Sequence, residues 1–344
     1  MARIASLASL TALASAALFT LAMGGCAAQD DASDADQGDT ADEFRAARPL
    51  GADPAGKATK FPIVLVHGFT GSLTLWNFVD VPEALTADGH RVFPLALHPF
   101  GTPDTNAALI KVLVDDILRK TGAAKVNIVA HSKGGLDARA YIANFKAGDK
   151  VASLTTISTP NHGTAVADGA LKVLPGSADG ALDTISKIWT HHFSSDDLAE
   201  GNDIRGALEA MAEKSSVAWN HAHPDDARVH YQSWAGVSNV FGIPGPHDED
   251  SCEGKGFLKN APRDRMDVKL VGAAALVGHG IALLANDGLS TVDSAKWGEF
   301  LGCIPADHQD DVGRPGQSGV DSRSGFDHVR FYRQLSFDLA KRGF

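Results

Sequence analysis

The chain has 344 residues, of which 44% are hydrophobic and 21% are charged. This apolar content is enough to bury the core of one large α/β domain, and it excludes a disordered chain. The net charge of −11 argues against nucleic acid or an anionic membrane surface as the main partner, because both attract basic faces.

Residues 1–26 have the pattern of an export signal. One early basic residue, Arg3, precedes a stretch of apolar and small residues that ends at Cys26. The final "MGGC" resembles a bacterial lipobox, in which Cys26 would be lipidated and become the mature N-terminus. We therefore expect an exported protein, either an outer-membrane or cell-surface lipoprotein or a secreted one. A plain cleaved signal and a retained apolar anchor are the alternatives.

Residues 27–60 are predicted to form a flexible linker. Between Asp30 and Glu43 every charged residue is acidic, and such a segment cannot bury apolar surface and stays solvated. It would tether the signal to a domain over residues 61–344.

The domain is predicted to be of the α/β class. Short β-branched runs alternate with helical stretches, which is typical of parallel strands joined by crossover helices. A helix is expected over 106–122, packed on the sheet through Leu109, Val112, Leu113 and Ile117. The predicted strands are, in chain order, 61–68, 91–97, 125–132, 151–159 and 228–236. Residues 164–226 contain no strong strand pattern and are read as an insertion over the sheet.

Ser132 is the candidate nucleophile. It lies in "NIVAHSKGGLDAR" (127–139), between a predicted strand and a predicted helix. A sharp strand-to-helix turn of this kind lifts a serine hydroxyl off the sheet and requires small flanking residues. Ala130 replaces the first glycine of the usual Gly-x-Ser-x-Gly pattern but adds only a methyl group. The alternative is an ordinary turn serine.

A serine nucleophile needs a base, an acid and donors for the oxyanion. The backbone N–H groups of Phe69, after the strand that ends in His67-Gly68, and of Lys133 are the candidate donors. The loop could also be a plain glycine-containing turn.

The acid and the base should follow the serine in the chain. Asp287 ends an apolar run at the expected place of a strand tip, with Asp293 as its competitor. Two histidines lie further on. His308 is in a loop and is preferred, whereas His328 starts the predicted C-terminal helix.

Two cysteines remain once Cys26 is set aside, Cys252 and Cys303. Because an exported protein meets an oxidising compartment, we expect a disulfide between them. Two unpaired, partly buried thiols or, less favoured, a metal site are the alternatives.

Together these motifs resemble the secreted bacterial triacylglycerol lipases, the family I true lipases of the α/β-hydrolase superfamily. The resemblance runs from about Phe61 to the C-terminus and is carried by "VHGFTG", "AHSKGGLDAR", "VASLTTISTPNHGT", "YQSWAG", "ANDGLS", "DHQDDV" and "FYRQL". It implies an α/β-hydrolase fold, a mostly parallel central sheet with helices on both faces and a helical lid at 164–226. It also favours His308, since in this family the base stands well before a Tyr-Arg-Gln run. The implied site is therefore a triad of Ser132, Asp287 and His308 with Phe69 and Lys133 as oxyanion donors.

The resemblance further implies a structural calcium ion that fastens the loop of the catalytic histidine. Asp264 and Asp310 match its two aspartates, with Asp267 as a near alternative to Asp264. Arg314 stands where the family has a glutamine ligand, and a guanidinium offers a cation no lone pair. The alternative is an ion pair between Arg314 and an aspartate that holds the same loop without metal.

The implied function is a serine ester hydrolase, a triacylglycerol lipase acting on acylglycerols at a lipid–water interface. The lid would present an apolar helical face made by Leu182, Ile185, Ile188, Trp189 and Phe193. An ordinary buried amphipathic helix gives the same pattern. The membrane would be reached through the lipid anchor, and a lipase foldase is a candidate partner. A short-chain esterase or polyester depolymerase, and a non-catalytic surface lipoprotein, are the rival functions.

Overall fold

The computed structural model describes residues 53–71, 78–174, 176, 202–256, 263–314, 320–321 and 324–344. The predicted export signal with Cys26, most of the linker and the predicted apolar lid helix lie outside the described residues.

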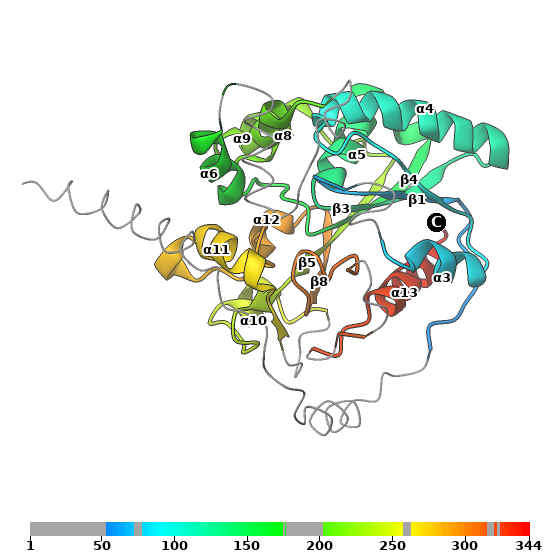
Figure 1. Ribbon diagram of the computed structural model, residues 1–344. Coiled ribbons are helices and arrows are strands. Elements are labelled where there is room, and N and C mark those ends of the chain that lie inside the picture. The colour runs from blue at the N-terminus through cyan, green and yellow to red at the C-terminus, as the bar shows by residue number, and fades with distance from the viewer. Residues whose placement is uncertain are drawn as a thin grey trace, which may run out of the picture. The chain divides into compact units, whose positions relative to one another are not determined.

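The centre of the structure is a six-stranded sheet in which each neighbouring pair of strands is parallel (Figure 1). In spatial order it contains β2 (Val92–Pro94), β1 (Ile63–Val66), β3 (Val126–His131), β4 (Val151–Ile157), β5 (His230–Gly236) and β8 (Glu299–Ile304). The five predicted strands are confirmed. The sixth, β8, was not predicted, because its short sequence "EFLGCI" interrupts the apolar run with Gly302.

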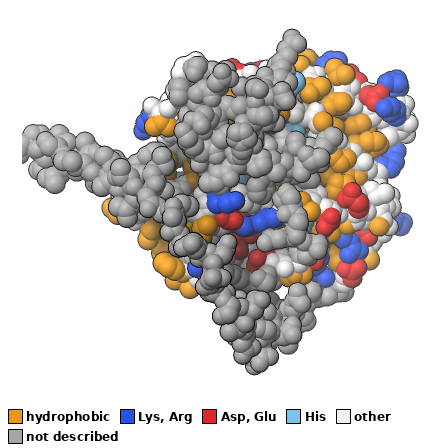
Figure 2. All heavy atoms as spheres, in the orientation of Figure 1, with side chains coloured by type: hydrophobic (Ala, Val, Ile, Leu, Met, Phe, Trp, Pro, Cys, Tyr) orange, Lys and Arg blue, Asp and Glu red, His pale blue; other side chains and the backbone are white. Residues whose placement is uncertain are grey.

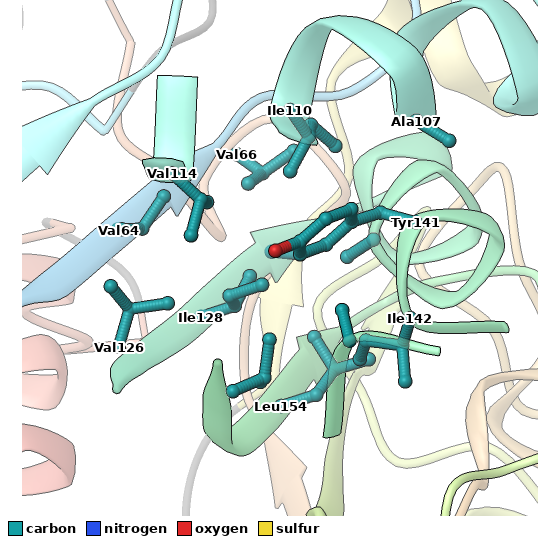
Figure 3. Close-up of a cluster of buried hydrophobic side chains, with 14 of the residues drawn as sticks. Val64, Val66, Ala107, Ile110, Val114, Val126, Ile128, Tyr141, Ile142 and Leu154 are labelled. Carbon is teal, nitrogen blue, oxygen red and sulfur yellow. The ribbon is translucent and has the colours of Figure 1, made fainter. Parts of the chain in front are cut away.

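Helices cover both faces of the sheet, as the predicted fold requires. All residues of β1, β3 and β4 are buried, which is expected when helices pack on both sides. Successive β1 residues belong to different cores. Val64 and Val66 face α4 (Pro103–Thr121) and α5 (Lys133–Asn144) (Figure 3), whereas Ile63 and Leu65 face α3 (Val81–Ala87) and α13 (His328–Lys341).

The core-facing side of α4 agrees with the prediction at three of its four residues, and only Val112 is at the surface. The helix begins after Thr102, whose hydroxyl accepts from the Thr105 N–H, and ends at Gly122 in the left-handed region. Its buried face is made by Asn106, Ala107, Ile110, Val114 and Ile117, while Val112 is 61% exposed. Leu109, Leu113 and Ile117 pack against the core as predicted, whereas the prediction did not include Ala107, which is fully buried in the same core.

The described part of 164–226 is helical and adds no strand to the sheet. It contains α6 (Ala165–Val173), α8 (Ile204–Met211) and α9 (Glu213–Ala222). Side chains of α6 and α8 share one apolar cluster with Phe69 and Phe100 of the preceding loops.

A long excursion separates β5 from β8. It contains β6 (Ser238–Asn239), α10 (Asp248–Ser251), β7 (Asp264–Arg265), α11 (Val268–Val277), η3 (Gly280–Ala282) and α12 (Val292–Ala295); the short η1 (Ala147–Asp149) lies earlier, between α5 and β4. No helix in the described ranges is long and apolar enough to cross a membrane.

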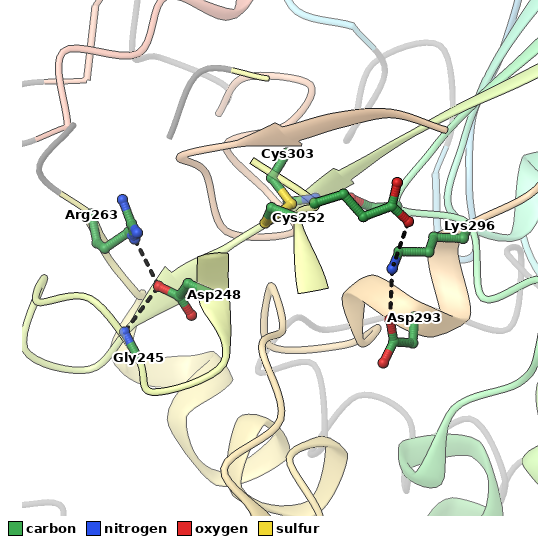
Figure 4. Close-up of a disulfide and its surroundings, with 10 residues drawn as sticks. Gly245, Asp248, Cys252, Arg263, Asp293, Lys296 and Cys303 are labelled. Carbon is green, nitrogen blue, oxygen red and sulfur yellow. Dashed lines mark hydrogen bonds and ion pairs between the residues drawn. A yellow bond between two sulfur atoms is a disulfide. The ribbon is translucent and has the colours of Figure 1, made fainter. Parts of the chain in front are cut away.

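The predicted disulfide is confirmed. Cys252 follows α10 and bonds to Cys303 of β8, with a Cα–Cα distance of 5.5 Å (Figure 4). Nearby, Asp248 accepts from the Arg263 guanidinium at 2.7 Å and from the Gly245 N–H at 2.9 Å. The bond therefore joins the excursion to β8, the last strand on that side of the sheet.

Removing this disulfide should destabilise the protein substantially. The bond closes a loop whose ends are 51 residues apart, and the chain-entropy model gives about 4 kcal/mol for a loop of that length. We expect the pair Cys252→Ala and Cys303→Ala to lower the free energy of unfolding by roughly this amount in urea titration. Reductant should lower the stability of the native protein and leave the double variant unchanged. Equal stability of the two oxidised proteins would contradict the prediction.

Candidate active site

Ser132 occupies a strained turn between β3 and α5. Its φ and ψ are 55° and −135°, a conformation that non-glycine residues rarely adopt. Two hydrogen bonds hold the backbone there. The Ser132 N–H donates to the Ile157 carbonyl at 2.9 Å, and the Thr159 hydroxyl donates to the Ser132 carbonyl at 2.7 Å. The strand–turn–helix context predicted for Ser132 is thus present.

Close backbone contacts explain the small residues around the serine. A Cβ atom on Gly134 would lie 2.4 Å from the His67 carbonyl oxygen, and one on Gly135 would lie 2.2 Å from the Thr159 hydroxyl. A Cβ on Gly68 would lie 2.6 Å from that of Ser132. The glycines are therefore a steric requirement of the turn.

The structure brings together the three residues predicted as a triad. His308 Nε2 lies 2.8 Å from Ser132 Oγ, and His308 Nδ1 lies 2.7 Å from Asp287 Oδ2. The other oxygen of Asp287 accepts the N–H groups of Leu289 and Ser290. A carboxylate that accepts from Nδ1–H leaves Nε2 as the acceptor for the serine hydroxyl. The arrangement can therefore remove the serine proton and stabilise the resulting imidazolium.

The competing residues lie elsewhere. Asp293 is on α12, largely exposed, and pairs with Lys296 at 2.9 Å. His328 starts α13, and its Nε2 donates to the Val79 carbonyl at 2.8 Å. One detail of the prediction was wrong, because Asp287 is not at a strand tip. It lies in the turn before α12, beside Gly236 at the end of β5.

A second histidine and carboxylate, which the sequence did not single out, lie behind His308. The rings of His131 and His308 have centroids 4.6 Å apart, and His131 Nε2 is 3.6 Å from Asp311 Oδ2. Burial lowers the pKa of His131 well below its usual value. Burial, aided by the charge of Asp287, raises the pKa of Asp311 well above its usual value. Burial thus favours the uncharged form of each group beside the triad.

His67 fixes the loop that carries Phe69. Its Nδ1 donates to the Gly68 carbonyl at 3.0 Å, and its Nε2 accepts the Leu97 N–H at 3.1 Å. Burial lowers the pKa of His67 to about 4, so the ring stays neutral near pH 7. Because the Gly68 carbonyl and the Phe69 N–H belong to one planar trans peptide, holding the carbonyl also fixes the direction of the N–H. Phe69 lines the pocket beside Ser132.

The side chain of Lys133 is buried in the protein, and its backbone N–H lies at the start of α5. Its Nζ lies 2.7 Å from both carboxylate oxygens of Asp137, one turn along the helix, and both side chains are buried. Asp137 also accepts from Asn106 of α4 at 2.8 Å. Burial lowers the pKa of Lys133 and raises that of Asp137, and their ion pair opposes both shifts. Lys133 is the first residue of α5, so its backbone N–H has no acceptor within the helix. An oxyanion donor must have a free N–H of this kind.

A pocket opens over Ser132 and His308. Most of the side chains that line the pocket are apolar. They are Phe69, Val166, Ala167, Leu208, Met211, Leu289 and Val312. Polar groups gather at the triad itself. Such a pocket suits a substrate with one polar reacting group and an apolar chain.

The predicted calcium ligands Asp264 and Asp310 come close to each other and to Asp307. One oxygen from each lies within 4.8 Å of the others. Burial and the charge of Asp307 raise the pKa of Asp264 to about 8 and that of Asp310 to about 7. However, the Arg314 guanidinium binds Asp307 and Asp310. This cluster does not fit a calcium ion well, because the guanidinium already pairs with two of its three carboxylates, Asp307 and Asp310. The alternative ion pair is thus present.

Comparison with known proteins identifies similar folds and sequences. A family model described as alpha/beta hydrolase fold matches residues 62–243. A triacylglycerol lipase of Vibrio cholerae is 28% identical over 312 residues, which cover 83% of this chain and 89% of that protein. A triacylglycerol lipase of Pseudarthrobacter phenanthrenivorans is 32% identical over 177 residues, covering 48% of this chain and only 55% of that protein.

Solved structures agree on the fold. A metagenomic carboxyl esterase superposes with a TM-score of 0.60 at 18% identity, covering 86% of this chain and 79% of that one. The mature form of a Bacillus licheniformis lipase superposes with a TM-score of 0.53 at 22% identity, covering 77% and 90% of the two chains.

Proposed function

Because this chain belongs to the alpha/beta hydrolase fold family, we propose that it hydrolyses carboxylic esters of acylglycerols with Ser132, His308 and Asp287. The observation that carries the proposal is the unbroken hydrogen-bond chain from Ser132 Oγ through His308 to Asp287.

The reaction runs through an acyl-enzyme. His308 Nε2 takes the Ser132 proton while Oγ attacks the ester carbonyl, and Asp287 stabilises the imidazolium. The N–H groups of Phe69 and Lys133 stabilise the oxyanion. His308 then gives its proton to the leaving alcohol. Water, activated by the same imidazole, breaks the acyl–Ser132 bond and releases the acid.

The substrate class rests on the apolar pocket walls and on the relatives. An acyl chain can be buried against Val166, Leu208, Met211 and Leu289, which favours fatty acyl esters over small polar ones. The two relatives described above carry the name triacylglycerol lipase.

An exposed apolar surface adjoins the pocket and suits a lipid–water interface. We define it as the apolar face, made by Val268, Leu276, Ile281 and Leu283 of α11 and its continuation. Ile281 is 101% and Val268 80% exposed, and residues 270–286 contain no Asp, Glu, Lys or Arg. Figure 2 shows hydrophobic side chains gathered where Figure 1 places α11. Exposed apolar surface of this kind marks an interaction site.

The apolar face connects to the pocket through two contacts. Leu289 lines the pocket and packs on Leu270 of α11. Leu276 lies over Gly169 of α6, the helix that supplies Val166 to the pocket. A lipid layer on the apolar face would therefore lie next to the substrate site.

The test is activity on emulsified long-chain triacylglycerol compared with a dissolved short-chain ester. We expect turnover to rise once the lipid forms an interface. Preference for short dissolved esters without such a rise would favour the esterase or polyester depolymerase alternative. Absence of any ester turnover would favour a non-catalytic surface protein.

Polar substitutions on the apolar face should separate interface binding from chemistry. Ile281→Ser with Leu283→Ser removes about 1–2 kcal/mol of apolar transfer per side chain, and since about 1.4 kcal/mol is a factor of ten, we expect at least about tenfold lower activity on emulsions. Activity on a dissolved ester should stay unchanged. Val112→Ser, at an exposed position of α4, is the matched control. Equal emulsion activity of the double variant and the control would contradict the assignment of this face.

Export, acylation of Cys26 and dependence on a lipase foldase belong to the same proposal. They rest on the sequence of residues 1–26 and on the resemblance to secreted lipases.

A further inference from the structure

Arg314 holds together the loop that carries His308. Its three guanidinium nitrogens reach three different carboxylates. Nη2 lies 2.7 Å from Asp307 Oδ2, Nε lies 2.5 Å from Asp310 Oδ1 and Nη1 lies 2.5 Å from Asp267 Oδ2. Nη2 also donates to the second oxygen of Asp310 at 2.9 Å. The guanidinium is mostly buried.

These partners lie on both sides of the catalytic histidine and on a distant element. Asp307 precedes His308 directly and Asp310 follows it by two residues. Asp267 caps α11, where its side chain accepts the Lys269 N–H. Arg314 therefore fastens the His308 loop to the start of α11, which adjoins the pocket.

The other contacts of Asp307 show how closely the loop is fixed. Its Oδ1 accepts the N–H groups of Gln309 and Asp310, and its Oδ2 accepts the Asp267 N–H. The Asp307 N–H donates to Asp264 at 3.0 Å. Burying this carboxylate is costly, and Arg314 offsets the cost with a positive charge and a hydrogen bond to Oδ2.

The guanidinium occupies the place that a divalent cation would need. The oxygens of Asp307 and Asp310 that a cation could share with Asp264 already bind Arg314 or backbone N–H groups. A metal ion could bind them only by displacing Arg314, and an arginine offers no lone pair to a metal.

We propose that Arg314 is a positioning residue that replaces a bound divalent cation, so that His308 is held for proton transfer without calcium. Only the expected effect of Arg314 on kcat rests on the proposed function. Its consequences for stability and metal response are independent of any ester turnover.

The experiment compares the native protein, Arg314→Gln and a matched control in millimolar calcium and in EGTA. Arg333→Gln is the control, since Arg333 also pairs with two carboxylates, Asp88 and Asp53, but joins α13 to the end of α3. The readouts are Tm, kcat and KM on a dissolved ester, and the fraction of Ser132 labelled by an active-site phosphonate.

We expect the native protein to show the same Tm and kcat in calcium and in EGTA. In EGTA, Arg314→Gln should lower Tm by roughly 10 °C and kcat by about ten- to a hundredfold, with KM nearly unchanged because the pocket walls are intact. Calcium should raise both Tm and kcat of this variant, since glutamine gives the cluster an oxygen ligand. Arg333→Gln should not respond to calcium.

The proposal is overturned if EGTA lowers the Tm or kcat of the native protein, or if Arg314→Gln behaves like Arg333→Gln. If Arg314→Gln does not fold, the comparison of the native protein in calcium and in EGTA still tests the proposal. If the native protein hydrolyses no ester, the proposed function fails, while the Tm measurements still test Arg314.

Discussion

Ser132→Ala is expected to lower ester turnover by about a millionfold and to leave the fold intact. The hydroxyl is the only group at the turn that can attack the carbonyl through His308, with which it shares a 2.8 Å hydrogen bond. Loss of a nucleophile that acts as a unit with its base costs about 10⁶ in kcat. Turnover of a dissolved ester, with the unfolding midpoint in urea as a check on folding, measures the effect.

Further variants test whether the three residues act as a unit. His308→Ala should cost about as much as Ser132→Ala, and combining the two should add little, because either loss removes the same proton transfer. Ser216→Ala is the control, since Ser216 is a serine of similar burial that donates only to the Glu213 carbonyl. Turnover by Ser132→Ala at the native rate would end the catalytic assignment.

Asp137→Ala is expected to destabilise the protein by about 3–5 kcal/mol, because it leaves the Lys133 ammonium buried without its partner. The first turn of α5 carries the Lys133 N–H, so turnover should fall as well, by up to about a hundredfold for a misplaced oxyanion donor. Urea unfolding and kcat on a dissolved ester measure the two effects.

Removing both charges should restore most of the stability. Lys133→Met with Asp137→Asn leaves no buried charge and keeps an acceptor for Asn106. The control is Asp115→Ala. Asp115 pairs with Lys111 at the same helical spacing and also with Lys150, but all three side chains are partly exposed, so its loss should cost about 1 kcal/mol or less per pair. A similar cost for the two single substitutions would show that burial of the Lys133–Asp137 pair is unimportant.

The sequence alone was sufficient for features that depend on neighbouring residues. All five predicted strands are present, and β1, β3 and β4, which are rich in apolar and β-branched residues, are buried throughout. The turn at Ser132 followed from a strand, small residues and a helix in succession. The disulfide followed from the presence of only two candidate cysteines.

The tertiary structure decided what depends on contacts between distant residues. His308 Nε2 meets Ser132 across 176 positions of the chain, and the sequence could separate His308 from His328 only by spacing and resemblance. No local sequence pattern indicated the position of Asp287 beside β5, the strand β8 or the contact between His131 and Asp311.

The two basic residues show the difference most clearly. The sequence made the Lys133 N–H a candidate oxyanion donor and indicated that Arg314 could pair with an aspartate, but it did not identify the carboxylates that the two side chains meet. Lys133 finds Asp137 inside the contact between α4 and α5, and Arg314 finds three aspartates from two segments. The reason is physical, because a long charged side chain can reach many partners, and the packing of the surrounding elements determines which of them it is buried against.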